Sequence, residues 1–174
     1  MKPLPAGIQS FADLRSSGYL YVDKTEDIYR MITTGKPYFL SRPRRFGKSL
    51  LISAMQAVFE GKRELFEGLY IYDKIDWARK HPVIRLDMSE RGHRSAKELE
   101  SSLHSFIEEK AEEYNISFIE KSLPGRFGEL IRNIHRQTGQ QVVVLIDEYD
   151  KPIIDNLKNI ELACANRTVL HDMY

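Results

Sequence analysis

The hydrophobic residues divide the chain into short apolar runs and longer stretches with helical spacing, an alternation typical of α/β folds. Runs with the length of strands occupy residues 37–40, 82–87 and 142–147. The last is continuously apolar and mostly β-branched before its aspartate, which predicts a strand buried on both faces. Helical spacing separates these runs. The pattern therefore predicts a mostly parallel sheet packed against helices.

Polar residues and glycines mark where the helices begin and end. Ser95 to Glu98 is a capping box, and Gly139 is expected to stop a helix that follows Gly125. Trp77 is expected to anchor the connector after the third helix. Ile8, Phe11 and Leu14 recur at helical spacing, with Ser10 as a candidate cap. The other expected helical segments are residues 25–32 with Thr25 or Asp23 as cap, 48–60, 95–113, 126–138 and part of the segment after Pro152.

Residues 42–49, Arg-Pro-Arg-Arg-Phe-Gly-Lys-Ser, join the first predicted strand to an apolar helix. A strand, a tight loop, Gly-Lys-Ser and a helix together describe the phosphate-binding P-loop, or Walker A motif. Backbone N–H groups of the loop would surround the phosphates, Lys48 would reach the outer phosphates, and the Ser49 hydroxyl would bind Mg²⁺. The expected binding residues are Arg44, Arg45, Phe46, Gly47, Lys48, Ser49 and Leu50.

One position departs from the usual motif, G-x-x-x-x-G-K-[ST], because residue 42 is an arginine where the first glycine would stand. Gly-Lys-Ser tripeptides also arise by chance. A basic surface turn that caps a helix is therefore the alternative interpretation of this segment.

A second motif favours the P-loop. The strand at residues 142–147 ends in Asp147 and is followed by Glu148, and α/β sheets bind ligands at the carboxyl ends of their strands. This is the pattern of a Walker B strand, in which Asp147 would hold Mg²⁺, directly or through water, and Glu148 would orient and deprotonate the attacking water. A core strand with a solvated acidic loop is the alternative. Both motifs together predict a nucleotide-binding domain with Glu148 and Lys48 as catalytic residues.

Other side chains are weaker candidates. Asp87 ends the second strand, where it could contact the metal or its water, or serve as a cap or turn residue. Tyr21, Asp23 and Lys24 precede the P-loop strand, a place often near the base and sugar of a nucleotide. Packing and capping are the ordinary alternative for each of them.

Composition and charge narrow the setting. The 174 residues suit one domain, and Lys+Arg 26 against Asp+Glu 25 gives no bulk charge that points to nucleic acid or membrane. Cys164 is the only cysteine, so an internal disulfide and a Cys-based zinc site are excluded. No stretch approaches the ~20 apolar residues of a membrane span, and the N-terminus lacks the apolar run of a signal peptide. We therefore expect a cytoplasmic protein.

The order of the motifs indicates a division of the P-loop proteins. A strand stands between the two motif strands in sequence, and a glutamate directly follows the Walker B aspartate. By analogy with known folds, these features mark the ASCE division, which includes AAA+ proteins. The expected fold is an α/β P-loop NTPase three-layer sandwich of ASCE/AAA type.

Four segments of the chain resemble the predicted AAA-ATPase-like family of bacterial and archaeal proteins: residues 18–25, 38–49, 82–89 and 144–152. The arginine-rich loop without its first glycine looks like this family's own form of the Walker A motif. The resemblance implies ATP and Mg²⁺ as cofactors. It assigns phosphate and Mg²⁺ binding to Lys48 and Ser49, and Mg²⁺ binding and water activation to Asp147 and Glu148.

The same resemblance implies a longer protein. Family members look like an ATPase core followed by a PD-(D/E)xK nuclease-like domain, of which this sequence shows no sign. We expect an N-terminal extension at residues 1–36 and a nucleotide-binding core at residues 37–174 that is incomplete at its C-terminus. In the ASCE sheet, the strand after Walker B lies between the two motif strands. The chain could be a fragment, a protein partner could supply that strand, or the two motif strands could pair directly.

Three functions remain open at this point. ATP binding with Mg²⁺-dependent hydrolysis leads. A nucleotide-binding switch or interaction module that does not hydrolyse ATP, or a fragment inactive alone, is the second. The third is nucleic-acid binding by Arg42, Arg44 and Arg45. So small a basic patch on a neutral chain would give little affinity for nucleic acid.

Overall fold

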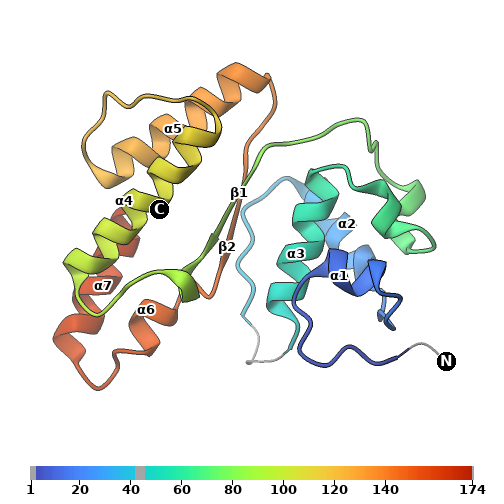
Figure 1. Ribbon diagram of the computed structural model, residues 1–174, viewed down its shortest axis with the longest axis horizontal. Coiled ribbons are helices and arrows are strands. Elements are labelled where there is room, and N and C mark those ends of the chain that lie inside the picture. Colours follow the sequence, from blue (N-terminus) through green and yellow to red (C-terminus); the bar gives the residue numbers. More distant parts are fainter. Residues whose placement is uncertain (1–2, 42–45, 174) are drawn as a thin grey trace. The chain divides into compact units, whose positions relative to one another are not determined.

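The computed structural model describes residues 3–41 and 46–173. The predicted phosphate-binding residues Arg44 and Arg45, together with Arg42, lie outside the described residues. The chain forms two compact units, Met1–Val83 and Ile84–Tyr174, and each is described by itself (Figure 1). Within the described residues, none of the helices combines the length and the apolar character needed to cross a membrane.

The first unit is built from helices. Its elements are α1 (Phe11–Ser16), α2 (Thr25–Thr34), α3 (Lys48–Phe59) and the 3-10 turns η1 (Arg63–Phe66) and η2 (Tyr70–Asp73). α1 packs against α3, and both contact η1. The ring of Phe66 is central to the core, with its centroid 4.8 Å from that of Phe11 and 5.0 Å from that of Trp77. Trp77 also donates from Nε1 to the carbonyl oxygen of Tyr72 at 2.8 Å, so its predicted role as an anchor is confirmed.

Local hydrogen bonds fix the starts of the first two helices. The predicted cap of α1 is confirmed, because Ser10 Oγ accepts from the N–H of Asp13 at 3.2 Å. The predicted cap of α2, Thr25 or Asp23, is wrong, because the N-cap residue is Lys24. Asp23 instead accepts from the N–H and hydroxyl of Thr25, at 2.8 and 2.7 Å, and from the N–H of Tyr70 at 2.7 Å. These bonds tie the start of α2 to η2.

The strand predicted at residues 37–40 is wrong, because this segment has no regular secondary structure. Tyr38 and Phe39 are 52% and 69% exposed. A strand persists when a neighbour satisfies its backbone N–H and C=O groups. The expected neighbour, the strand after Walker B, is not among the described elements, and Pro37 lacks an N–H. The apolar run is therefore present without the pairing that would make it a strand.

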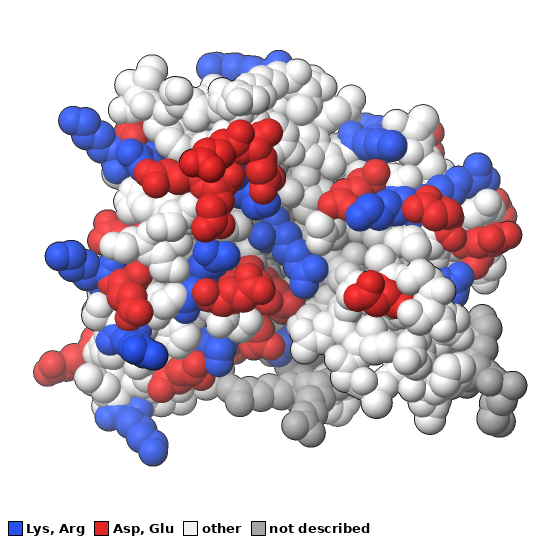
Figure 2. All heavy atoms as spheres, in the orientation of Figure 1, with Lys and Arg blue, Asp and Glu red and all other residues white. Residues whose placement is uncertain are grey.

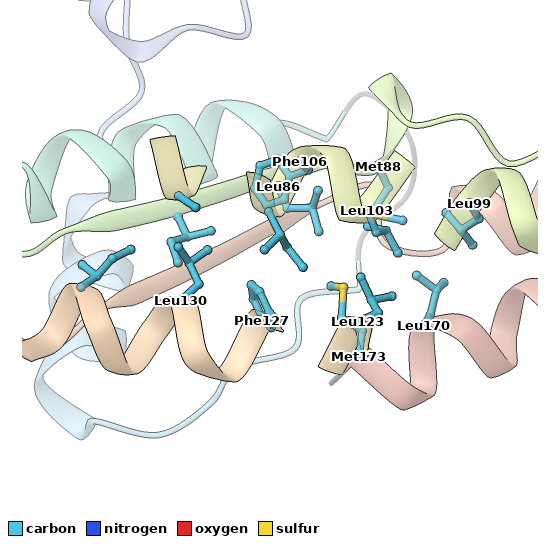
Figure 3. Close-up of a cluster of buried hydrophobic side chains, with 14 residues drawn as sticks. Leu86, Met88, Leu99, Leu103, Phe106, Leu123, Phe127, Leu130, Leu170 and Met173 are labelled. Atoms are coloured by element: carbon cyan, nitrogen blue, oxygen red, sulfur yellow. The ribbon is translucent and has the colours of Figure 1, made fainter. Parts of the chain in front are cut away.

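The second unit combines a small sheet with helices. Strands β1 (Val83–Asp87) and β2 (Val143–Asp147) pair as a two-stranded parallel sheet within the described residues. The helices are α4 (Ala96–Glu113), α5 (Leu123–Thr138), α6 (Lys151–Ile154) and α7 (Ile160–Met173), and the turn η3 (Met88–Glu90) follows β1. α4, α5 and α7 contact one another. Figure 3 shows their side chains meeting those of β1 in one core, among them Leu86, Leu103, Leu130 and Leu170.

Helix boundaries in the second unit agree with the predicted caps at two places. Ser95 Oγ accepts from the N–H of Glu98 at 3.1 Å, which confirms Ser95 as the cap of α4. The second bond of the predicted capping box differs, because the Glu98 carboxylate accepts from the N–H of Arg94 at 2.9 Å and not from that of Ser95. Gly139 ends α5 at φ +68°. The predicted start of α5 after Gly125 is wrong, because Ser122 caps the helix and Gly125 lies in its first turn.

The burial of β2 is less complete than its sequence predicts. Leu145 and Asp147 are buried, whereas Val143, Val144 and Ile146 are only partly buried. A strand is buried on both faces only where other elements cover both faces of its sheet. The described residues therefore form a mixed fold of helices and a two-stranded parallel sheet. A complete P-loop sandwich remains a prediction.

Candidate functional site

The first candidate segment is the start of α3, in the first unit. Gly47 is the N-cap residue with φ +73° and ψ 23°, in the left-handed region. Open space lies where a side chain would begin at this position, so the glycine is needed for its backbone conformation and not to avoid a clash. Lys48 and Ser49 form the first turn that follows, and both are partly buried. Gly-Lys-Ser therefore turns the chain directly into a helix N-terminus.

The N-terminus of α3 differs from those of α1 and α4. Ser10 and Ser95 cap α1 and α4, and each of these helices carries an acidic residue in its first turn, Asp13 or Glu98. In the described part of the chain, α3 has neither a side-chain cap nor an acidic residue in its first turn. The first turn of a helix presents backbone N–H groups and positive partial charge. This terminus therefore suits an anion from outside the helix.

A cavity of about 590 Å³ adjoins this helix start within the first unit. Gly47 and Leu50 line it together with the aromatic residues Tyr21, Tyr38 and Phe46. Its volume lies in the range of small-molecule pockets. The cavity can thus hold a ligand with a flat apolar part whose anionic end reaches the helix terminus.

The three weaker candidates before the P-loop, Tyr21, Asp23 and Lys24, have different surroundings. Tyr21 and Lys24 line the cavity. Burial, the main influence, raises the pKa of Tyr21 to about 12, so its hydroxyl keeps its proton at neutral pH. The Asp23 carboxylate is engaged by Thr25 and Tyr70 instead, and these hydrogen bonds lower its pKa although burial, the largest single influence, opposes them. Asp23 therefore has the structural role that was its alternative interpretation.

The second candidate segment is the carboxyl end of β2, in the second unit. Asp147 is the last residue of the strand and is only 1% exposed. Its Oδ1 atom accepts from the N–H of Glu148 at 3.0 Å, whereas Oδ2 is buried without a hydrogen-bond partner. A buried carboxylate oxygen without a partner is unfavourable unless a cation or donor approaches it. One oxygen of Asp147 is therefore held in place and the other can accept a ligand.

Glu148 has an unusual backbone conformation. Its φ is +50°, and in the described residues Asn115 is the other non-glycine with a positive φ. Such a conformation costs about 1 kcal/mol or more in a residue with a side chain. The chain therefore turns sharply right after Asp147. Strained positions of this kind cluster at functional sites.

The carboxylate of Asp147 offers one open oxygen to a Mg²⁺ ion. The described residues contain no group of three His, Cys, Asp or Glu side chains that could hold a metal by themselves. Mg²⁺ is commonly bound by one or two carboxylates together with waters and substrate phosphates, so the single open oxygen of Asp147 fits. Asp87 accepts from the N–H of Ser89 at 2.8 Å and caps η3, which confirms the cap role that was one of its two predicted alternatives.

Two features of the second unit were not among the sequence-based predictions. Arg85, on β1, has its Nη2 atom 3.9 Å from Asp147 Oδ2. The second feature is a cluster after β2, in which Asp155 accepts from Lys151 Nζ at 2.7 Å and contacts His93 Nε2 at 3.1 Å. In the sequence, Arg85 stands between Ile84 and Leu86 in an otherwise apolar strand, which could have marked it as a candidate. The cluster joins residues far apart in sequence and left no such signal.

The cluster fixes the chain that follows the candidate site. His93 Nδ1 lies 2.8 Å from the carbonyl oxygen of Arg91, so both ring nitrogens face oxygen atoms. Asn166 on α7 donates from Nδ2 to the carbonyl oxygens of His93 and Pro152, at 3.1 and 2.9 Å. The hydrogen bond from Lys151 lowers the pKa of Asp155, with a further contribution from His93 and opposition from burial. α6 and α7 are thereby bound to the loop after β1.

Comparison with known proteins places the chain in a family. Residues 5–174 match the sequence model of the AAA-ATPase-like family, described as "Predicted AAA-ATPase". The chain belongs to this family. It is also similar to a protein of Azotobacter chroococcum mcd 1 described as "Uncharacterized protein in vnfD 5'region". The two are 44% identical over 174 residues, which are 99% of this chain and 34% of the relative. The chain thus spans about a third of that relative's length. No solved structure matches it significantly.

Proposed function

We propose that this chain binds ATP and hydrolyses it with the help of Mg²⁺. The observation that carries the proposal is the buried Oδ2 atom of Asp147, which has no hydrogen-bond partner at the end of a strand. It occurs in a chain that also has Gly-Lys-Ser at an uncapped helix start. Membership of a family described as "Predicted AAA-ATPase" supports ATP as the nucleotide.

The phosphate groups would be bound at the start of α3. The N-terminus of α3 contributes backbone N–H groups and positive partial charge, and Lys48 neutralises the charge that develops on the outer phosphates. The cavity beside Gly47, with Tyr21 and Lys24 in its wall, would accept the base and ribose. The complete set of proposed phosphate-binding residues is Arg44, Arg45, Phe46, Gly47, Lys48, Ser49 and Leu50.

The metal and the attacking water would be held by oxygen atoms. The Ser49 hydroxyl and the Asp147 carboxylate are the proposed ligands of Mg²⁺, which when bound neutralises charge on the phosphate oxygens. Glu148 would orient a water molecule and accept its proton during in-line attack on the γ-phosphate. The backbone of Glu148 also donates to Asp147, so one turn of chain would position both carboxylates.

The proposal requires both halves to act on one nucleotide. Gly47 to Ser49 belong to the first unit and Asp147 and Glu148 to the second. We propose that residues 37–174 form a nucleotide-binding core after an N-terminal extension at residues 1–36. Its sheet would grow from β1 and β2 into the three-layer P-loop sandwich when a further segment or a protein partner supplies the missing strand. A cytoplasmic location fits such an ATPase.

An equilibrium titration with ATP tests the phosphate half. Lys48→Ala should weaken ATP binding by about 100-fold or more, since a charge that meets the phosphates directly is lost. Lys97→Ala is the matched control, because Lys97 is an exposed lysine on α4. It should bind ATP like the parent chain. Equal affinities for the parent chain and Lys48→Ala would contradict the proposal.

Hydrolysis is tested separately by phosphate release. Glu148→Gln should keep ATP binding and lose at least about 100-fold in turnover, because general-base catalysis contributes about 10²–10⁴-fold. The absence of a strand at residues 37–40 favours a second candidate, a module that binds nucleotide without hydrolysing it. In that case the parent chain would bind ATP through Lys48 and release no phosphate.

A further inference from the structure

We infer that Arg85 acts as a counter-charge for Asp147, so that the metal site binds a divalent cation weakly until a nucleotide is present. Arg85 lies in the middle of β1, and Asp147 ends the paired strand β2. Arg85 would be a positioning residue rather than a catalytic one. The inference rests on the proposed role of Asp147 as a ligand of Mg²⁺.

The distance between the two groups carries the argument. Arg85 Nη2 lies 3.9 Å from Asp147 Oδ2, within reach of charge attraction but beyond a hydrogen bond. Several ion pairs of the described residues are much closer, for example Arg126 with Glu108 at 2.7 Å and Lys151 with Asp155 at 2.7 Å. Arg85 therefore balances the charge of the carboxylate without occupying the coordination position of Oδ2.

Burial makes this charge balance important. The side chain of Asp147 is 1% exposed and that of Arg85 is 30% exposed. Removal of one partner of such a pair leaves a buried charge uncompensated, which is unfavourable. The carboxylate would then attract any other cation more strongly. Arg85 thus stabilises the metal-free protein and, by the same charge, opposes a divalent cation at Oδ2.

A regulatory consequence follows for the nucleotide site. Mg²⁺ alone meets one open carboxylate oxygen and a nearby guanidinium group, a weak combination. ATP would add phosphate oxygens as further ligands and further negative charge. Metal binding at Asp147 would therefore depend on prior or simultaneous binding of the nucleotide. The charge of Arg85 would determine how strongly the metal affinity depends on the nucleotide.

Titration of the chain with Mn²⁺ alone tests the inference by electron paramagnetic resonance, which reports the free metal without any nucleotide. Arg85→Met should raise the affinity for Mn²⁺ by about ten-fold, a modest gain because Arg85 is partly exposed. Arg85→Lys keeps the charge and should restore weak binding. Asp147→Asn added to Arg85→Met should abolish the gain.

Thermal unfolding provides an independent readout. Metal-free Arg85→Met should unfold at a lower temperature than the parent chain, and saturating Mn²⁺ should reduce this difference. Arg126→Met is the matched control, since Arg126 has a side chain 25% exposed and paired with Glu108. Its loss of stability should not depend on Mn²⁺. If Arg85→Met does not fold, Arg85→Gln, which keeps a polar side chain, replaces it in both measurements.

Several results would overturn the inference. They are equal or weaker Mn²⁺ binding by Arg85→Met, metal affinity in Arg85→Lys as high as in Arg85→Met, and absence of Mn²⁺ binding in every variant. None of these measurements contains a nucleotide. Failure here is therefore distinguishable from failure of the proposed ATPase function, which the titration of Lys48→Ala with ATP decides.

Discussion

The start of α3 suits an anion and the end of β2 suits a cation, and the two segments achieve this in different ways. At α3, the backbone itself supplies positive partial charge, and Gly47 in the left-handed conformation sets the direction of the chain. At β2, a carboxylate is buried at the end of a strand, and tertiary packing around β1, α4 and α5 keeps it there. A local sequence can therefore specify the first site, whereas the second depends on a folded core.

Charge on the surface agrees with this picture of localised sites. Figure 2 shows basic and acidic side chains intermixed on the face in view, in keeping with the nearly equal totals of 26 and 25. Binding to a polyphosphate would then rely on the specific geometry at α3 and β2. A broad electrostatic surface of one sign is not needed.

The largest effect should come from the core that holds β2. Leu103 is fully buried in α4 (Figure 3), and Leu103→Ala should lower the free energy of unfolding by about 2–5 kcal/mol because it leaves a cavity. Urea denaturation measures this loss. The exposed Leu157→Ala should change stability by less than about 0.5 kcal/mol. A similar loss from both variants would contradict the dependence of the second site on this core.

The local character of the first site can be tested with two glycines. Gly47→Ala and Gly68→Ala place a side chain at φ +73° and +75°, both with open space around them. Each should therefore cost about 1–2 kcal/mol of stability through backbone strain alone. Only Gly47→Ala should also weaken ATP binding, by about ten-fold or more, because the first turn of α3 would shift. Equal ATP affinities of the two variants would show that the conformation of Gly47 does not matter for binding.

Structure that forms within one turn of chain could be predicted from the sequence. Ser10, Ser95 and Gly139 were predictable because a cap involves residues within one turn of each other. The conformation of residues 37–40 could not be predicted in this way, because a strand there would need a neighbouring strand that is distant in sequence. The predicted start of α5 after Gly125 is wrong because Ser122, as cap, and Pro124 form a favourable first turn before that glycine.

The candidate site also combines residues that the sequence predicts with contacts that it does not. Gly47, Lys48 and Ser49 were found from a contiguous motif, and Asp147 from the strand that it ends. The contact between Arg85 and Asp147 joins residues on two paired strands, and no spacing in one sequence reveals their pairing. The cavity beside Gly47 was also hidden, since its wall combines α2, α3 and the segments before them.

A smaller effect concerns the cluster that fixes α6. The hydrogen bond from Lys151 lowers the pKa of Asp155, so the ionised carboxylate stabilises the folded chain. Because the pKa is lowered on folding, this contribution is full above the unfolded value of about 3.9 and is lost as the pH falls through the folded value. Asp155→Asn should cost about 0.5 kcal/mol at pH 7, a small amount for a partly exposed ion pair.

Urea denaturation of Asp155→Asn and the parent chain across a pH series measures this contribution. The difference between them should shrink as the pH falls below about 4, where the Asp155 carboxylate takes up its proton. A difference that grows as the pH falls below about 4 would show that Asp155 is not stabilised in its ionised form.

The most direct test of the central claim is the effect of Mg²⁺ on ATP affinity in the parent chain and in Asp147→Asn. If the start of α3 and the end of β2 act on one nucleotide, Mg²⁺ should strengthen ATP binding by the parent chain by about ten-fold or more. Asp147→Asn should bind ATP without Mg²⁺ at least as well as the parent chain and gain much less from the metal. The same gain from Mg²⁺ in both chains would show that Asp147 takes no part in the nucleotide site.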